Sequence, residues 1–167
     1  VARVPVSPLW DVAFLLFFAA AISDIVDGYL ARRWNIVTDF GRVTDPFVDK
    51  IIVCGSFVFF LRIPALEKIL PAWMVVVILA REFLVSGIRS LLEAKGLPFP
   101  ANWWGKQKML VQSIAVCVTL FTLGHWLDRS WSMGVLQALL WVALVSTVFS
   151  GITYLYEARA LFRAKDI

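Results

Sequence analysis

The chain has 167 residues, of which 60% are hydrophobic and 17% charged, with a formal net charge of +4. A soluble domain is closer to half apolar and a quarter charged. One soluble core could not bury so much apolar surface, so we expect a membrane protein. The basic residues group between apolar stretches, which argues against a nucleic-acid partner. No linker or internal repeat divides residues 1–167, and we expect them to form one domain.

Five apolar stretches follow one another along the chain. At about 1.5 Å per residue, each can cross a bilayer core about 30 Å thick, the shortest with help from flanking residues. Because they are continuously apolar rather than alternating, helices are favoured over a β-barrel. The sequence therefore predicts an all-α, polytopic membrane helix bundle. The predicted spans are 12–31, 46–61, 70–88, 109–123 and 133–156.

The connections between these spans differ in positive charge. Placing 32–50 inside also places 89–108 and the C-terminal tail inside. Basic residues concentrate on the cytosolic side of membrane proteins, so we expect a cytosolic C-terminus. Eleven basic residues then lie inside: Arg32, Arg33, Arg42, Lys50, Arg89, Lys95, Lys106, Lys108, Arg159, Arg163 and Lys165. Four lie outside: Arg3, Arg62, Lys68 and Arg129.

The cysteines and the single histidine carry no recognisable chemistry. Cys54 and Cys117 lie within apolar runs without metal-ligand spacing, so we expect small buried hydrophobes, and two such residues give no basis for a disulfide framework. His125 alone supports neither a zinc site nor a Ser-His-Asp triad, and is expected to be an ordinary polar residue at a helix end.

Two aspartates lie in the last turns of the first span. Asp24 and Asp27 are three residues apart, which puts both carboxylates on one helix face. Gly28 and Ala31 follow on that face, and Arg32 lies beside it. The two acids therefore adjoin a strip without side-chain bulk, where a ligand can approach the backbone.

A second pair, Asp45 and Asp49, surrounds Pro46. Proline at a first helical position with aspartate before it is typical of a helix start, so Asp45 is a predicted N-cap. Gly41 is expected in a short turn that reverses the chain.

The four aspartates have two interpretations. They can be interfacial acids that cap helices or pair with nearby basic residues. Four carboxylates brought together would repel unless cations hold them, however, and ionisable groups at membrane depth are usually functional. Hard oxygen ligands suit Mg²⁺ or Mn²⁺, so we favour a metal site.

The spacing of these residues resembles a known family. The pattern Asp24-x-x-Asp27-Gly28-x-x-Ala31-Arg32, eight residues, Gly41-x-x-x-Asp45-x-x-x-Asp49 is similar to the complete signature of the CDP-alcohol phosphotransferases. That family has six membrane helices, is usually dimeric, and moves a substituted phosphoryl group from a CDP-linked donor to an alcohol, releasing CMP.

The resemblance implies a role for each matching residue. Asp24, Asp27, Asp45 and Asp49 would bind two Mg²⁺ ions, with Mn²⁺ as a substitute, and Asp49 would be the catalytic base for the acceptor hydroxyl. The CDP donor would be bound by Gly28, Ala31, Arg32, Thr38 and Gly41.

Two further segments resemble those of bacterial phosphatidylglycerophosphate synthases within the family. They are Arg81-Glu82-Phe83-Leu84-Val85-Ser86-Gly87-Ile88-Arg89 and Asn102-Trp103-Trp104-Gly105-Lys106-Gln107-Lys108. This resemblance implies CDP-diacylglycerol as the donor and sn-glycerol 3-phosphate as the acceptor, in the inner membrane of a bacterial-type cell. The acceptor phosphate would be bound by Arg81, Glu82, Arg89, Lys106 and Lys108.

The same two segments also allow purely structural interpretations. Arg81 and Glu82 can form a structural ion pair, with Ser86 and Arg89 on the stripe of Glu82. Lys106 and Lys108 can set topology or contact anionic lipid.

The chain departs from the family at its start. Only 20 residues separate Arg3 from Asp24, so we expect the first family helix to be missing or incomplete. Three other functions are compatible with the same residues. They are a sister enzyme that uses inositol phosphate or phosphatidylglycerol as acceptor, a divalent-cation transporter and a non-catalytic scaffold.

Overall fold

The computed structural model describes residues 8–34, 39–96 and 103–165. Within these ranges the chain is helical, without strands, as predicted. The five long helices match the five predicted spans, and each is longer than its span. They are α1 (Pro8–Trp34), α2 (Asp39–Phe60), α3 (Ala72–Ala94), α4 (Trp103–Phe121) and α5 (Ser132–Lys165). A 3-10 helix, η1 (Pro64–Leu66), follows α2, and a π-helix, η2 (Thr122–Trp126), follows α4.

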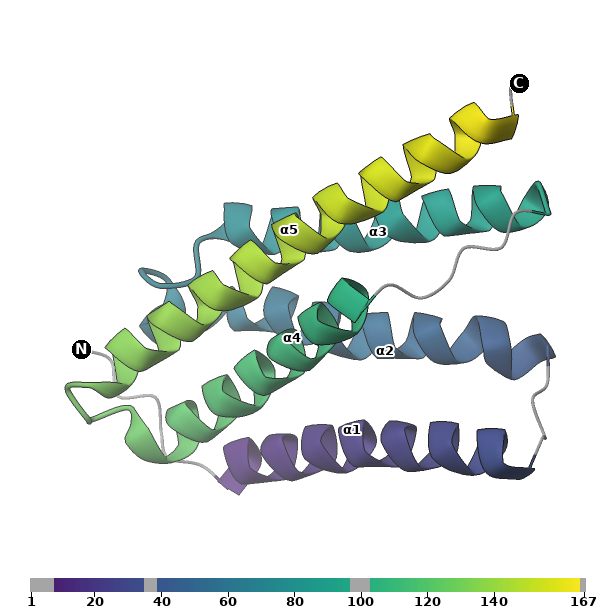
Figure 1. Ribbon diagram of the computed structural model, residues 1–167. Coiled ribbons are helices and arrows are strands. Elements are labelled where there is room, and N and C mark those ends of the chain that lie inside the picture. The colour runs from purple at the N-terminus through teal and green to yellow at the C-terminus, as the bar shows by residue number, and fades with distance from the viewer. Residues whose placement is uncertain (1–7, 35–38, 97–102, 166–167) are drawn as a thin grey trace.

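The helices form a bundle in which α5 packs against both α3 and α4, and α4 also contacts α1 (Figure 1). The C-terminal end of α1 and the N-terminal end of α2 lie at the same end of the bundle, on the right in Figure 1. The connection between them spans residues 35–38, which lie outside the described residues. The aspartates of the two predicted pairs therefore belong to helix segments that approach one end of the bundle.

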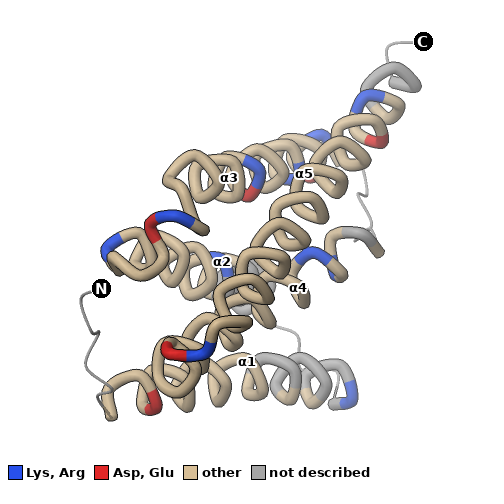
Figure 2. The backbone as a smooth tube through the Cα atoms, turned by 90° about the vertical axis from the view of Figure 1, so that its left-hand side faces the viewer, with Lys and Arg blue, Asp and Glu red and all other residues tan. Residues whose placement is uncertain are grey.

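The surface of the bundle is apolar, as a bilayer requires. Large hydrophobic side chains stay exposed along the helices, among them Leu16 at 67%, Phe83 at 72% and Val145 at 61%. Patches of this extent are rare on soluble monomers. In Figure 2 the described charged residues gather mainly toward helix ends, whereas α3 carries charge within its length. The chain is an integral membrane helix bundle.

Length and composition distinguish helices that could cross a membrane from shorter apolar segments. Among the described residues, Gly105–Trp126 and Ser132–Leu161 are long and apolar enough to cross a membrane. Pro8–Ser23 and Lys50–Phe60 are shorter apolar segments. Helix α3 is not among the helices that are apolar enough to cross a membrane, because it carries charged residues. These charged side chains need partners inside the bundle.

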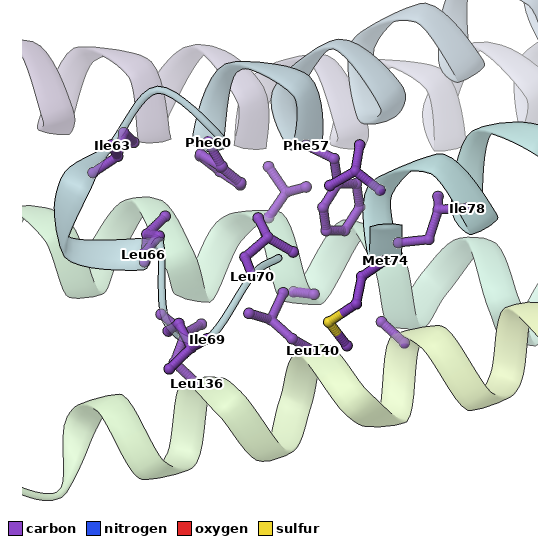
Figure 3. Close-up of a cluster of buried hydrophobic side chains, with 14 of the residues drawn as sticks. Phe57, Phe60, Ile63, Leu66, Ile69, Leu70, Met74, Ile78, Leu136 and Leu140 are labelled. Atoms are coloured by element: carbon purple, nitrogen blue, oxygen red, sulfur yellow. The ribbon is translucent and has the colours of Figure 1, made fainter. Parts of the chain in front are cut away.

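Many of the most deeply buried apolar side chains gather around the segment that connects α2 to α3, as the close-up in Figure 3 shows. Phe57 and Phe60 of α2 pack edge to face, with ring centroids 6.3 Å apart. The segment after α2 folds inward around η1, so that Leu66 is fully buried. Met74 of α3 and Leu140 of α5 complete the contact from the other side. Dense packing of this kind, rather than hydrophobic expulsion, stabilises helix contacts in lipid.

The π-helix η2 directly follows α4 and contacts the start of α1. His125 Nε2 lies 2.9 Å from Asp11 Oδ1, and the His125 ring packs against Phe121 with centroids 4.8 Å apart. His125 is thus a polar residue at a helix end, as predicted, and its partner is an acid outside the signature. Cys54 and Cys117 are free thiols, and Cys54 is buried as predicted, whereas Cys117 is only half-buried.

The predicted start of the second span is wrong. Helix α2 begins at Asp39, so Asp45 lies within the helix and is not its N-cap. Gly41 is likewise helical rather than part of a turn. Pro46 lacks the N–H that would bond to the carbonyl of Arg42, yet the helix runs through it. The Asp-Pro pattern marks a helix start only where no earlier turn precedes it.

Candidate active site

The helices place the four predicted acids in two helix segments. Asp24 and Asp27 lie in the second half of α1, and Asp45 and Asp49 lie in the first half of α2. In a continuous helix, Asp45 and Asp49 are one turn apart on the same face. The two acid pairs therefore sit on either side of the α1–α2 connection.

The side chains of the four aspartates lie outside the described part of the structure, so their predicted convergence stays a prediction. The same holds for the side chains of the predicted donor-site residues, and Thr38 lies wholly outside the described ranges. Among the described side chains, no three His, Cys, Asp or Glu come together as a metal site, and the four aspartates are not among them. The predicted donor-site residues are Gly28, Ala31, Arg32, Thr38 and Gly41.

A second group of predicted residues does converge, between α3, α4 and α5. Glu82 of α3 accepts hydrogen bonds at Oε1 from Arg81 Nη1, at 3.1 Å, and from Lys108 Nζ of α4. The exposed fractions of Arg81, Glu82 and Lys108 are only 9%, 5% and 5%. A buried carboxylate with two cationic partners is an ion-pair network at membrane depth.

Lys50 extends this network to α2. Its Nζ donates to Ser86 Oγ, and Ser86 Oγ donates to the main-chain oxygen of Glu82 at 2.7 Å. Lys50 directly follows Asp49, so the helix that carries the predicted catalytic acid is joined to α3 at the next residue. We call Lys50, Arg81, Glu82, Arg89 and Lys108 the basic cluster.

The basic cluster contains four cationic side chains and one carboxylate, so most of its positive charge has no counter-charge within the cluster. Arg81 keeps Nε and Nη2 without hydrogen-bond partners among the described residues, and Arg89 keeps Nε unpaired in the same sense. Buried guanidinium N–H groups without acceptors are costly. An anion that enters between α3 and α5 would supply those acceptors.

Lys106 is not part of the basic cluster. It lies two residues before Lys108, about 200° around α4, and is exposed. It borders a cavity of about 460 Å³ between α1, α2 and α4. The cavity is otherwise mainly apolar, with Phe17 and Ala21 on α1 and Ile52 on α2 among its lining residues. The structure thus separates two lysines that the sequence places together.

Sequence reasoning missed two members of this region. The sequence indicates for Lys50 only a role in topology and in pairing with the nearby acids, although its position directly after Asp49 is a signal. Tyr154 of α5 was not singled out, yet it is 3% exposed and its hydroxyl accepts a hydrogen bond from Arg89 Nη2 at 3.1 Å. A phenol inside an otherwise apolar span was the available signal, because a buried hydroxyl needs a partner.

The fold and the basic cluster define a polytopic helical membrane protein with a cationic interior. Residues 6–149 match the family described as CDP-alcohol phosphatidyltransferase, and the chain belongs to that family. Membership makes it an enzyme of this transferase class, in agreement with the signature of the four aspartates.

Individual relatives are similar over most of the chain. A CDP-diacylglycerol–glycerol-3-phosphate 3-phosphatidyltransferase of Bacillus subtilis is 40% identical over 141 residues, covering 84% of this chain and 69% of the relative. A protein of the same name from Rickettsia felis is 31% identical over 175 residues, covering 97% and 93%. That of Haemophilus influenzae is 30% identical over 155 residues, covering 87% and 76%.

Proposed function

We propose that this enzyme transfers the phosphatidyl group of CDP-diacylglycerol to sn-glycerol 3-phosphate, giving phosphatidylglycerophosphate and CMP. The observation that carries the proposal is the basic cluster, whose buried guanidinium groups keep unpaired N–H donors. A phosphate monoester offers several oxygen acceptors and negative charge, which Arg and Lys match. The names of the relatives agree with this acceptor.

The acceptor phosphate would bind Arg81 and Arg89, the two cluster members with N–H groups left over. Lys108 would add positive charge while its ammonium stays on Glu82. Glu82 would then not contact the phosphate, which its own charge repels, but would hold Arg81 and Lys108 in place.

Asp49 would act as the general base. It would take the proton of the acceptor hydroxyl, whose oxygen forms a bond to the lipid-side phosphorus of the donor. The bond from that phosphorus to the bridging oxygen breaks, and CMP departs with the bridging oxygen. Lys50 ties this part of α2 to Ser86, which would keep Asp49 near the acceptor bound by α3.

The donor set on α1 and α2 fits Mg²⁺, because carboxylate oxygens are the ligands that this ion prefers. Asp24, Asp27, Asp45 and Asp49 would hold two such ions, with Mn²⁺ as a substitute. Bound there, the metal would neutralise charge on the donor diphosphate. Arg32, with the small residues Gly28 and Ala31, would complete the nucleotide side together with Thr38 and Gly41.

The cavity between α1, α2 and α4 would take an acyl chain of the donor. Its apolar lining suits a hydrocarbon tail, and Lys106 at its border would meet a phosphate or an anionic headgroup. Ile22 and Ile52 of the lining lie within one turn of Asp24 and Asp49 along their helices. A tail in the cavity would therefore keep its diphosphate near the acids.

The remaining proposals concern the cellular setting. We infer an inner (cytoplasmic) bacterial membrane with the active site and the C-terminus on the cytosolic side, which the distribution of basic residues supports. We also infer a homodimer, on the family resemblance alone.

CMP release by the purified protein tests the proposal. CDP-diacylglycerol and Mg²⁺ would be supplied with glycerol 3-phosphate, inositol phosphate, phosphatidylglycerol or glycerol. We expect release with glycerol 3-phosphate, much less with glycerol, and none after chelation of the metal. Release with a different phosphorylated alcohol would reject the acceptor, and release that survives chelation would reject the metal. No release with any alcohol, by a full-length folded protein, would reject the transferase reaction.

A further inference from the structure

Tyr154 contacts both arginines of α3 that keep guanidinium N–H groups without partners among the described residues. Its hydroxyl accepts from Arg89 Nη2 at 3.1 Å, and the guanidinium carbon of Arg81 lies 5.4 Å from the centre of its ring. The residue is 3% exposed and belongs to α5, far from both arginines in sequence. One side chain therefore contacts one guanidinium through its polar end and the other through its ring face.

These contacts leave part of each guanidinium unused. Arg81 is held by Glu82 at Nη1 and by the Tyr154 ring, while its Nε and Nη2 have no partner among the described residues. Arg89 is held at Nη2, while its Nε has none in the same part of the chain. Each arginine is thus fixed at one side and keeps N–H groups for a ligand.

The neighbouring backbone leaves Tyr154 little freedom. A methyl group on Gly105 of α4 would lie 3.0 Å from the Tyr154 hydroxyl oxygen, so the hydroxyl already touches that helix. On α5, a methyl group on Gly151 would lie 3.1 Å from Arg81 Cγ. Tyr154 and Arg81 therefore pack against positions that only glycine fits without a shift.

We propose that Tyr154 is a positioning residue for the phosphate of the acceptor alcohol. It orients Arg81 and Arg89 so that their unused N–H groups face one phosphate monoester. It thereby favours a phosphorylated over an unphosphorylated alcohol, without touching the substrate itself. This inference rests on the proposed function, because it concerns the acceptor of that reaction.

Steady-state kinetics of Tyr154→Phe and Tyr154→Leu test the role. The first keeps the ring beneath Arg81 and loses the hydroxyl, and the second loses both contacts. We expect the KM for glycerol 3-phosphate to rise about tenfold in Tyr154→Phe and about a hundredfold in Tyr154→Leu. The KM for CDP-diacylglycerol should stay unchanged, since a structural defect alone would not separate the two substrates.

Glycine variants provide matched controls. Gly105→Ala should displace the Tyr154 hydroxyl and raise the acceptor KM in the same direction, by a smaller factor. Gly87→Ala, on α3, adds a methyl group where nothing lies within 4 Å and should leave both KM values unchanged. An acceptor KM in Tyr154→Phe equal to that of the wild type, or equal rises for both substrates, would overturn the proposal.

Binding of inorganic phosphate separates this inference from the proposed function. Calorimetric titration of the folded wild type and of Tyr154→Phe with inorganic phosphate measures binding without any need for enzymatic turnover. If the wild type releases no CMP with glycerol 3-phosphate, the proposed function fails, and the titration still decides about Tyr154. Weaker phosphate binding by Tyr154→Phe supports the positioning role. Equal binding by the two proteins, or none by the wild type, contradicts it.

Discussion

Lys108 of α4 donates its ammonium hydrogen bond to Glu82 of α3 inside the bundle, where each side chain is only 6% exposed. The same carboxylate oxygen accepts from Arg81 Nη1. The structural ion pair that the sequence allowed for Arg81 and Glu82 is therefore present, with Lys108 as its third member, and the role of these residues in binding an acceptor stays a prediction. The Glu82 carboxylate stabilises the two cations at membrane depth. Arg81 and Lys108 use only some of their N–H donors in these bonds.

Glu82→Gln is expected to lower the free energy of unfolding by about 3 kcal/mol, because it leaves buried Lys108 and Arg81 without a counter-charge. Thermal unfolding in detergent measures the loss. Glu93→Gln is the matched control, since Glu93 lies exposed on the same helix and should change stability by less than about 0.5 kcal/mol. Equal stability of Glu82→Gln and the wild type would mean that the pair contributes nothing.

Asp49→Asn is expected to reduce CMP release by about a hundredfold or more, because the amide cannot take the hydroxyl proton. The protein should still elute as a folded species, since the substitution keeps the shape of the side chain. Asp11→Asn, near the start of α1 beside His125, is the control and should retain turnover. Wild-type turnover by folded Asp49→Asn would remove this residue from the role of base.

Filling the cavity between α1, α2 and α4 tests the acyl-chain site. Ala21→Phe puts a ring into the lining and should raise the KM for a long-chain CDP-diacylglycerol about tenfold. A donor with short chains should be affected less, because its tail does not reach as deep. Ala19→Phe, exposed on the same helix, should leave both values unchanged. Equal effects on long and short donors would place the tail elsewhere.

Phe57→Ala tests the apolar core. Phe57 has no exposed surface, and its loss should cost about 3–5 kcal/mol through the cavity left behind. Phe59→Ala, at a residue that is 58% exposed, should cost much less. Both variants should keep the wild-type acceptor KM at temperatures where they are folded. A changed acceptor KM in Phe57→Ala would show that the core and the basic cluster are not independent.

Much of the architecture could be predicted because long apolar runs in a membrane protein have few structural options. The five helices lie where hydropathy put them, although hydropathy could not locate their charged ends, as α5 continuing to Lys165 illustrates. The start of α2 was missed because the Asp45-Pro46 pair is also compatible with a helix that is already running. η1 and η2 depend on tertiary packing and left no periodic signal.

The site was predictable where a local pattern exists and not where helices meet. Spacing put Glu82, Ser86 and Arg89 on one stripe, and Ser86 Oγ indeed bonds to the Glu82 main chain. The spacing of Lys106 and Lys108 could not tell which of them faces α3, because that depends on how α4 is rotated in the bundle. Tyr154 pairs with Arg89 across 65 positions, a separation that no local pattern encodes.

The contribution of α5 to this site has a consequence for biogenesis. Arg81 and Arg89 enter the membrane with α3, but Tyr154 follows only with the last of the described helices. A nascent chain that has inserted α1 to α4 therefore holds both arginines without the side chain that contacts them both. With the proposed role of Tyr154, the acceptor site is complete only when α5 joins the bundle, and a chain that ends after α4 is expected to bind inorganic phosphate more weakly than the full bundle.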